Sequence, residues 1–178
     1  MRGATGSSSN FVLVEWTTSD VFNIVAPLTL MVWYRNVDNK CNHLLSRTNT
    51  TTSAPYYHFS FAGGVNYGKG IQLSFQYYSG GALVNNNSTI TSAVPIDGKY
   101  HLLTVTKDLQ YVKFYVDNKL LEAISSTSQL DSHSGYGLCQ GIPWYDGGNW
   151  GSDGDFGESA VFSRALSPQE ISAYYKWA

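Results

Sequence analysis

Apolar and polar side chains alternate along much of this chain, and this period of two constrains the fold more than any other feature of the sequence. In residues 70–78, GIQLSFQYY, every second residue from Ile71 to Tyr77 is apolar, and Gln or Ser stands between. The same alternation recurs in residues 100–108 and 111–121. Each segment is therefore predicted to be a strand with one buried face and one face in water.

Residues 111–124 are predicted to form a hairpin, because Asp117 and Asn118 suit a tight turn whose residues have positive φ. Residues 28–34 are apolar on both sides, as expected of a central strand. The other strand candidates lie at 11–16, 44–47, 56–61 and 155–162. This run of short strands predicts an all-β fold, a two-sheet antiparallel β-sandwich. Three segments rich in Ser, Thr, Asn and Gly are predicted to be loops: 49–55, 79–95 and 125–135.

The chain ends in a strand that leads directly into a helix predicted over residues 167–178. Ser167 and Glu170 are spaced as an S-x-x-E capping box, which satisfies N–H groups at the start of a helix. Apolar residues follow at the helical spacing i, i+3 and i+4, namely Ile171, Tyr174 and Tyr175. The helix is therefore expected to pack on the sandwich.

The composition indicates that residues 1–178 form one domain. A chain of 178 residues, of which 43% are hydrophobic, has enough apolar side chains for one buried core. Residues 1–10 are expected to be flexible or extended. Only 13% of residues are charged and the net charge is -2, which excludes the basic surface of a nucleic-acid-binding protein. No apolar run approaches the ~20 residues that cross a bilayer, so membrane insertion is not expected.

No signal peptide is seen, because the first residues, MRGATGSSSN, contain no apolar run. Either the protein stays in the cytoplasm, or it leaves by a route that needs no signal, such as assembly into a virus particle, or a signal has been removed from the sequence. We expect a location on a virion surface or outside the cell. Cys41 and Cys139 are too few for a disulfide scaffold and too far apart for a zinc motif. They are either two buried thiols, which the missing signal favours, or one disulfide.

Five segments of the chain resemble the laminin-G-like, concanavalin A-like jelly-roll family, in the same order and at similar spacing. They are PLTLMVWYR, HLLSR, DGKYHLLTVTKD, VKFYVDNKLL and GDFGESAVFSRALSPQEI. The likeness extends from about residue 11 to the end of the chain. It implies a two-sheet jelly roll of a family whose members are mostly non-catalytic modules that bind glycans or proteins, many on adhesins, secreted enzymes and bacteriophages.

The family resemblance also bears on calcium. Members often carry an Asp in the closing motif that helps to hold a structural calcium ion, and Gly157 stands at that position here. Asp153, Asp155 and Glu158 could still supply the oxygen ligands that calcium prefers. The alternative is that these acids are solvated turn formers.

Catalysis is not expected, although Asp153, Asp155 and Glu158 resemble the E-x-D-x-x-E motif of retaining glucanases that share the sandwich. The first position is Asp rather than Glu, which would retract a nucleophile by about one bond length. The family pattern also accounts for Glu158 as an ordinary residue of the closing strand. The histidines show no metal-ligand spacing, and each is expected to be an ordinary strand or loop residue: His43, His58, His101 and His133.

The glycine-rich segment 141–155, GIPWYDGGNWGSDGD, is the predicted ligand site. Sugars bind to aromatic faces flanked by carboxylate and amide groups, and this segment holds both kinds of side chain. The candidate ligand-binding residues are Trp144, Tyr145, Asp146, Asn149, Trp150 and Asp153. The alternative is that the tryptophans simply cover the sandwich edge.

The sequence thus favours a non-enzymatic binding or adhesion module that recognises a glycan or a surface polymer. A second hypothesis is a structural decoration protein of a phage capsid or tail, whose partners are other virion proteins. A glycan-cleaving enzyme is the third. Fold alone does not decide among them.

Overall fold

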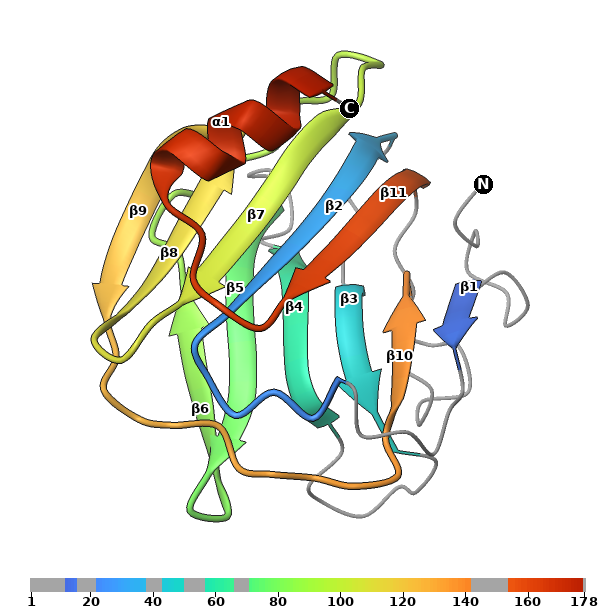
Figure 1. Cartoon of the computed structure of the whole chain (residues 1–178). Helices are drawn as coiled ribbons and strands as arrows, with labels where there is room; N and C mark the ends of the chain where they lie inside the picture. The colour runs from blue at the N-terminus through green and yellow to red at the C-terminus, as the bar shows by residue number, and fades with distance from the viewer. Residues whose placement is uncertain are drawn as a thin grey trace.

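The computed structural model describes residues 12–15, 22–37, 43–49, 57–65, 71–141 and 154–177. These residues form two antiparallel sheets packed face to face, with one helix near the C-terminus (Figure 1). The predicted fold class, an all-β two-sheet sandwich with a short closing helix, is confirmed. The N-terminal segment 1–10 lies outside the described residues.

One sheet has six strands in the order β1-β10-β3-β4-β5-β6. These are Val12–Glu15, Gly137–Gln140, His43–Thr48, Tyr57–Val65, Ile71–Ser79 and Ala82–Asn87. The other sheet has five strands in the order β11-β2-β7-β8-β9. These are Gly154–Phe162, Leu28–Asn36, His101–Lys107, Tyr111–Val116 and Lys119–Ser125. The helix α1 spans Pro168–Trp177 and lies across the outer face of the five-stranded sheet (Figure 1).

The main core fills the space between the sheets and agrees with the predicted alternation. Ile71, Leu73, Phe75 and Tyr77 of β5 all point into it and are fully buried. Leu103 and Val105 of β7 enter from the facing sheet. Ring contacts join the two layers, as between Phe61 and Phe114, whose centroids are 6.4 Å apart.

The prediction that the other face of β7 lies in water is wrong. Thr104 pairs with Met31 on one side and Tyr115 on the other, and it is buried with them. A second apolar cluster covers this outer face and consists of Met31, Leu102, Tyr115, Leu166 and Ile171. Helix α1 supplies its lid, because Ile171 is fully buried and Tyr175 stacks on Trp33 with ring centroids 5.5 Å apart.

The predicted capping box forms at the start of α1. The backbone N–H of Ser167 donates to Glu170 Oε2 at 2.8 Å, and the backbone N–H of Glu170 donates to Ser167 Oγ at 3.3 Å. Hydrogen bonds from the Ser167 backbone and hydroxyl, with a third from Arg164, lower the pKa of Glu170 to about 2. The carboxylate therefore stays ionised over the pH range in which the protein would be studied.

Two strands were not predicted. β6 lies inside the segment 79–95 that was predicted to be a loop, and β10 was not anticipated at all. β6 is an edge strand with three consecutive Asn residues, so packing imposes no apolar alternation on it. Gly80 and Gly81, with φ of 58° and 77°, make the hairpin turn that leads into it. β10 has only four residues, too few to show a period.

The hairpin predicted over 111–124 is confirmed. Asp117 and Asn118 adopt φ of 48° and 63° between β8 and β9, as a tight hairpin turn requires. Cys139 of β10 is buried, with its Sγ 3.7 Å from Thr48 Oγ1. Cys41 lies outside the described residues, so whether the two cysteines pair is not tested. In the part of the chain that the structure describes, no helix has the length and apolar character of a membrane span.

Truncation of Ile171 tests the role of the helix as a lid. Ile171→Ala should lower the free energy of unfolding by about 2 to 5 kcal/mol, because the side chain is fully buried and leaves a cavity. The measurement is urea unfolding followed by fluorescence. Ile96→Ala is the matched control, since Ile96 is 52% exposed and its loss should cost little. Equal destabilisation by both variants would contradict the assignment.

Candidate functional site

The predicted ligand residues fall in the segment that joins β10 to β11. Trp144, Tyr145, Asp146, Asn149, Trp150 and Asp153 lie outside the described residues. The structure does describe the two points between which this segment runs, Gly141 after β10 and Gly154 at the start of β11. Gly141 therefore follows a strand of the six-stranded sheet, and Gly154 begins a strand of the five-stranded sheet.

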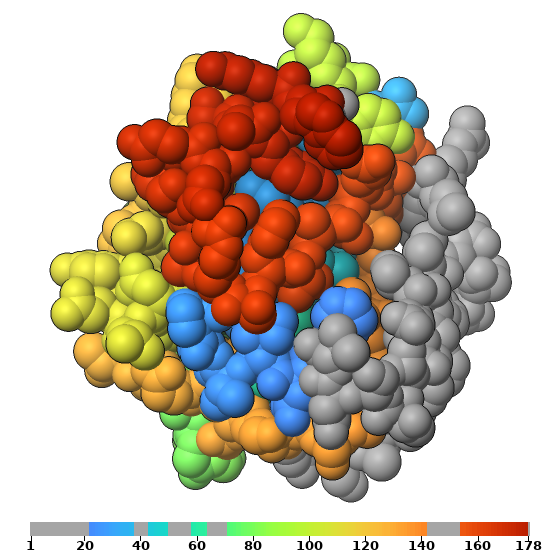
Figure 2. Space-filling view, viewed as in Figure 1, coloured from blue at the N-terminus to red at the C-terminus, as the bar shows by residue number. Residues whose placement is uncertain are grey.

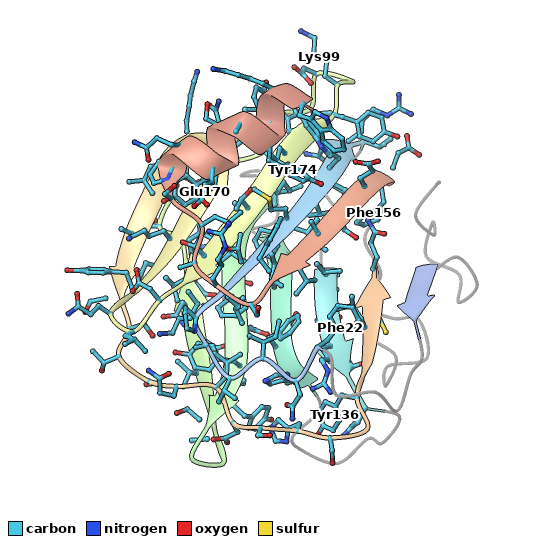
Figure 3. The ribbon with its side chains drawn as sticks, viewed as in Figure 1. Phe22, Lys99, Tyr136, Phe156, Glu170 and Tyr174 are labelled. Atoms are coloured by element: carbon cyan, nitrogen blue, oxygen red, sulfur yellow. The ribbon has the colours of Figure 1, made fainter. Side chains whose placement is uncertain are left out.

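The two ends of this segment are held tightly against the core. Gln140 Nε2 donates to the carbonyl oxygen of Gly157 at 3.2 Å and so links the two sheets. A Cβ at Gly141 would lie 3.2 Å from the ring of Phe156, and one at Gly154 only 2.5 Å from the ring of Tyr34. Phe156 itself lies between the sheets (Figure 3). Close packing therefore excludes a side chain at Gly154, and at Gly141 the φ of 86° adds a backbone preference for glycine to the tight contact.

Arg35, Asp155 and Tyr100 form a charged and aromatic cluster beside Gly154. Arg35 and Asp155 are register partners on β2 and β11, and Arg35 Nε donates to Asp155 Oδ2 at 2.8 Å, with a second bond from Nη2. The guanidinium carbon lies 5.4 Å from the centroid of the Tyr100 ring, a cation–π distance. Asp155 is buried, whereas the Arg35 side chain is 41% exposed and Tyr100 is 42% exposed. A cation and an aromatic face are thus presented together to solvent.

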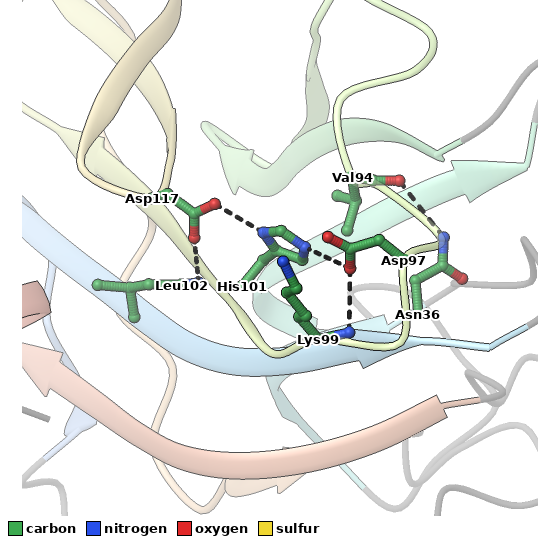
Figure 4. Close-up of polar contacts among 7 residues, drawn as sticks. All are labelled: Asn36, Val94, Asp97, Lys99, His101, Leu102 and Asp117. Atoms are coloured by element: carbon green, nitrogen blue, oxygen red, sulfur yellow. Dashed lines mark hydrogen bonds and ion pairs between the residues drawn. The ribbon is translucent and has the colours of Figure 1, made fainter.

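His101 fixes the loop that carries Tyr100. Its Nδ1 lies 2.6 Å from Asp117 Oδ2, and its Nε2 lies 3.1 Å from Asp97 Oδ1 (Figure 4). Asp117 Oδ1 also accepts the backbone N–H of Leu102, and Asp97 Oδ1 accepts that of Lys99. The imidazole therefore ties the loop before β7 to the β8–β9 turn.

The protonated form of His101 is favoured by this arrangement. Burial opposes the charge, but hydrogen bonds to Asp117 and Asp97 outweigh it and raise the pKa of His101 above 6.5. The hydrogen bond from His101 in turn lowers the pKa of Asp97. On the far side of the loop, Asn36 Nδ2 donates to the carbonyl of Val94 at 3.4 Å. Contacts on both sides thus fix the loop that leads to Tyr100, whose ring lies beside Arg35.

The other histidines differ from His101. His43 is buried, with Nδ1 2.8 Å from Ser60 Oγ, and burial lowers its pKa to about 4. Burial, with the neighbouring charge of Arg47, lowers the pKa of His58 to about 3. Both fit the expectation of ordinary strand residues. His101 is also a strand residue, the first of β7, but the sequence shows no sign that the loop and the turn bring two carboxylates to its ring.

Comparison with known families identifies the chain. The family model described as the concanavalin A-like lectin/glucanases superfamily matches residues 8–172. The chain belongs to this superfamily. The resemblance inferred from the five sequence segments is therefore confirmed. No curated protein sequence matches the chain.

Solved structures share the concanavalin A-like fold at low identity. The Ruminococcus gnavus IT-sialidase CBM40 bound to alpha2,3 sialyllactose is 16% identical, with a TM-score of 0.73 over 98% of this chain and 97% of that one. A SAP-like pentraxin from Limulus polyphemus is 12% identical, with a TM-score of 0.65 over 85% and 70% of the two chains. Domain 4 of a Geobacillus stearothermophilus arabinanase in complex with arabinotriose is 12% identical, with a TM-score of 0.58 over 84% and 66%.

Three observations on the described residues bear on the predicted calcium site of this concanavalin A-like chain. No group of three or more His, Cys, Asp or Glu side chains among them could hold a metal ion. Asp155 already receives the guanidinium of Arg35, which puts positive charge where a cation would bind. A Cβ at Gly157 would lie 3.0 Å from Trp33 Cβ, so an Asp there would be crowded. Asp153 lies outside the described residues, and calcium at Asp153, Asp155 and Glu158 stays a prediction.

The glucanase-like motif has a structural use in this member of the superfamily. Asp155 is buried and serves as the acceptor for Arg35. Glu158 is exposed and lies where the pairing of β11 with β2 shifts register, between Phe156 and Ser159. The sequence pattern gave no sign of Arg35 or Tyr100 as site residues. Only the register of β2 against β11 brings Arg35 to Asp155.

A pH titration tests the position of His101. Its folded-state pKa is raised, so the stabilisation is complete below about pH 6.5 and is lost as pH rises through the folded pKa. The stability difference between the wild type and His101→Gln, measured by urea unfolding, should therefore be larger at pH 5.5 than at pH 9.

An NMR titration of His101 in two aspartate variants, one as the test and one as its control, checks the same hydrogen bonds. Asp97→Asn removes one partner and should lower the pKa of His101. Asp108→Asn, which removes a comparable acid that accepts backbone N–H groups in another turn, should leave it unchanged. A His101 that titrates below 6.5 in the wild type would rule out the proposed ion pairs.

Proposed function

We propose that this chain is a non-enzymatic module that binds glycans at the end of the sandwich where Arg35, Tyr100 and Asp155 lie beside Gly154, the first described residue after the aromatic segment 142–153. The carrying observation is the cation–π pair of Arg35 and Tyr100, held by the buried Asp155 beside the point where the segment joins β11. A planar cation and an aromatic ring, both partly exposed, are suited to a sugar surface that carries hydroxyls on its edge and C–H groups on its face.

The chemistry of Arg35 supports this use. Nε and Nη2 donate to Asp155, and within the described residues Nη1 remains available to donate to a ligand oxygen. The ion pair also fixes the guanidinium before a ligand arrives, so that little side-chain freedom is lost on binding. The His101 network fixes the backbone next to Tyr100, because its hydrogen bonds join His101 to Asp97 and Asp117.

The similar solved structures support glycans as the ligand class. The Ruminococcus gnavus module is bound to sialyllactose and the arabinanase domain is in complex with arabinotriose. Both ligands are carbohydrates on the same fold, although the low identities do not carry their binding residues over to this chain. Display on a virion or outside a cell, and attachment to other virion proteins, stay predictions.

Substitution of the cluster tests the proposal. A glycan array identifies the ligand, with sialyllactose and arabinotriose included as the first probes. Arg35→Ala and Tyr100→Ala should each weaken binding by roughly tenfold or more, as expected for loss of a hydrogen bond to a charged group or of a stacking ring. The measurement is isothermal titration with the best ligand of the array.

The chain offers a matched control. Lys113 lies 5.4 Å from the centroid of the Tyr111 ring and pairs with Asp108 at 3.3 Å, which repeats the cation, ring and carboxylate set away from the proposed site. Lys113→Ala and Tyr111→Ala should leave binding unchanged. Equal losses in both sets, or no loss in the first, would contradict the proposal.

A further inference from the structure

A groove of about 360 Å³ lies between helix α1 and the end of β11, on the outer face of the five-stranded sheet. Figure 2 shows it as a hollow below the red helix on the face turned to the viewer. Its main lining consists of Phe162, Arg164, Leu166, Glu170, Tyr174 and Trp177. All six belong to the described residues. The volume is within the range of small-molecule sites.

Three aromatic rings form the walls of the groove. Phe162 and Tyr174 meet edge to face, with centroids 6.4 Å apart, and Tyr174 and Trp177 lie 6.4 Å apart at 55°. Tilted rings leave their faces available, unlike rings stacked on one another. Trp177 is 81% exposed, the highest fraction of any large hydrophobic residue that the structure describes as exposed. Most of the Trp177 side chain is therefore in contact with solvent beside the groove.

An ion pair supplies the polar part of the groove. Arg164 Nη1 lies 2.7 Å from Glu170 Oε1, and the two side chains are about half exposed. Glu170 Oε2 accepts the hydrogen bonds of the helix cap, so the carboxylate is fixed in place. The guanidinium offers several N–H donors and the carboxylate offers further acceptor positions, and both side chains line the groove together with the aromatic rings.

We propose that this groove is a second saccharide site, in which a pyranose ring of a neutral sugar stacks on Trp177 and its hydroxyls bind Arg164 and Glu170. The ligand class rests on the proposed function, but the site shares no residue with the Arg35 cluster. A protein partner is a poorer fit, because a stable protein interface covers about 800 Å² on each side and this groove has few lining residues.

NMR spectroscopy tests the site directly. The indole N–H signal of Trp177 is assigned with Trp177→Phe and followed while lactose, cellobiose and maltose are added to the labelled protein. At least one of these sugars should shift the signal in a saturable way. Trp177→Ala should weaken that sugar's affinity by roughly two- to tenfold, the range of an aromatic contact. Because Trp177 is exposed, this variant should keep the wild-type unfolding midpoint.

Three controls make the outcome decisive. Tyr111→Ala removes another exposed ring and should leave the titration unchanged. Arg35→Ala should also leave it unchanged, so a failure of the Arg35 site and a failure of the groove are distinguishable. The proposal is overturned if no sugar shifts the Trp177 signal, or if Trp177→Ala binds as the wild type does. It is also overturned if the signal responds only to protein concentration, which would indicate a second copy of the chain in the groove.

Discussion

The pairing of β11 with β2 is the constraint on which the functional end of this molecule depends. It joins residues more than a hundred positions apart in sequence and brings Asp155 opposite Arg35 and Phe162 opposite Thr29. The first pair creates the charged cluster next to the start of β11. The far end of the strand is tied down as Thr29 Oγ1 donates to the Arg164 carbonyl and accepts the backbone N–H of Leu166. A single strand pairing therefore positions the ion pair, the connection to α1 and the helix.

Hydrogen bonds from side-chain carboxylates hold several surface turns of this weakly charged chain in place. Carboxylates here mostly accept backbone N–H groups in turns, as Asp131 does from Gly80 and Gly81 and Glu122 does from Thr89. His101 differs in that both of its ring nitrogens face carboxylates. Its effect is local and electrostatic, whereas the apolar cores set the global fold. The loop that carries Tyr100 can therefore be loosened without unfolding of the sandwich.

The sequence predicts those features of the fold that arise from local chemistry. The alternation from Ile71 to Tyr77 predicts a buried strand face, and the pair Asp117 and Asn118 predicts a turn. Both predictions succeed because the two features depend only on residues that are close in sequence. The capping box of Ser167 and Glu170 is recovered for the same reason. β6 was not predicted, because an edge strand needs no apolar face and its sequence therefore shows no alternation.

The candidate site is less predictable, because its residues come together through tertiary structure. Arg35 and Tyr100 look like ordinary surface residues until the register of β2 against β11 and the His101 network bring them together. The buried Thr104 gives a related lesson. A polar residue at alternate positions indicates water only when nothing else covers that face, and α1 covers it here.

β11 combines an exposed edge with the two surfaces for which we propose ligands, and edge strands are prone to pair with other chains. Two features oppose such pairing. The register shift between Phe156 and Ser159 interrupts the ladder, and Glu158 adds an exposed charge there. A strand protected in this way can present side chains to small ligands on its outer face while its backbone resists extension of the sheet. The register shift comes after Asp155 and Phe156, which still pair with Arg35 and Tyr34, so it interrupts the edge without disturbing the ion pair at the start of the strand.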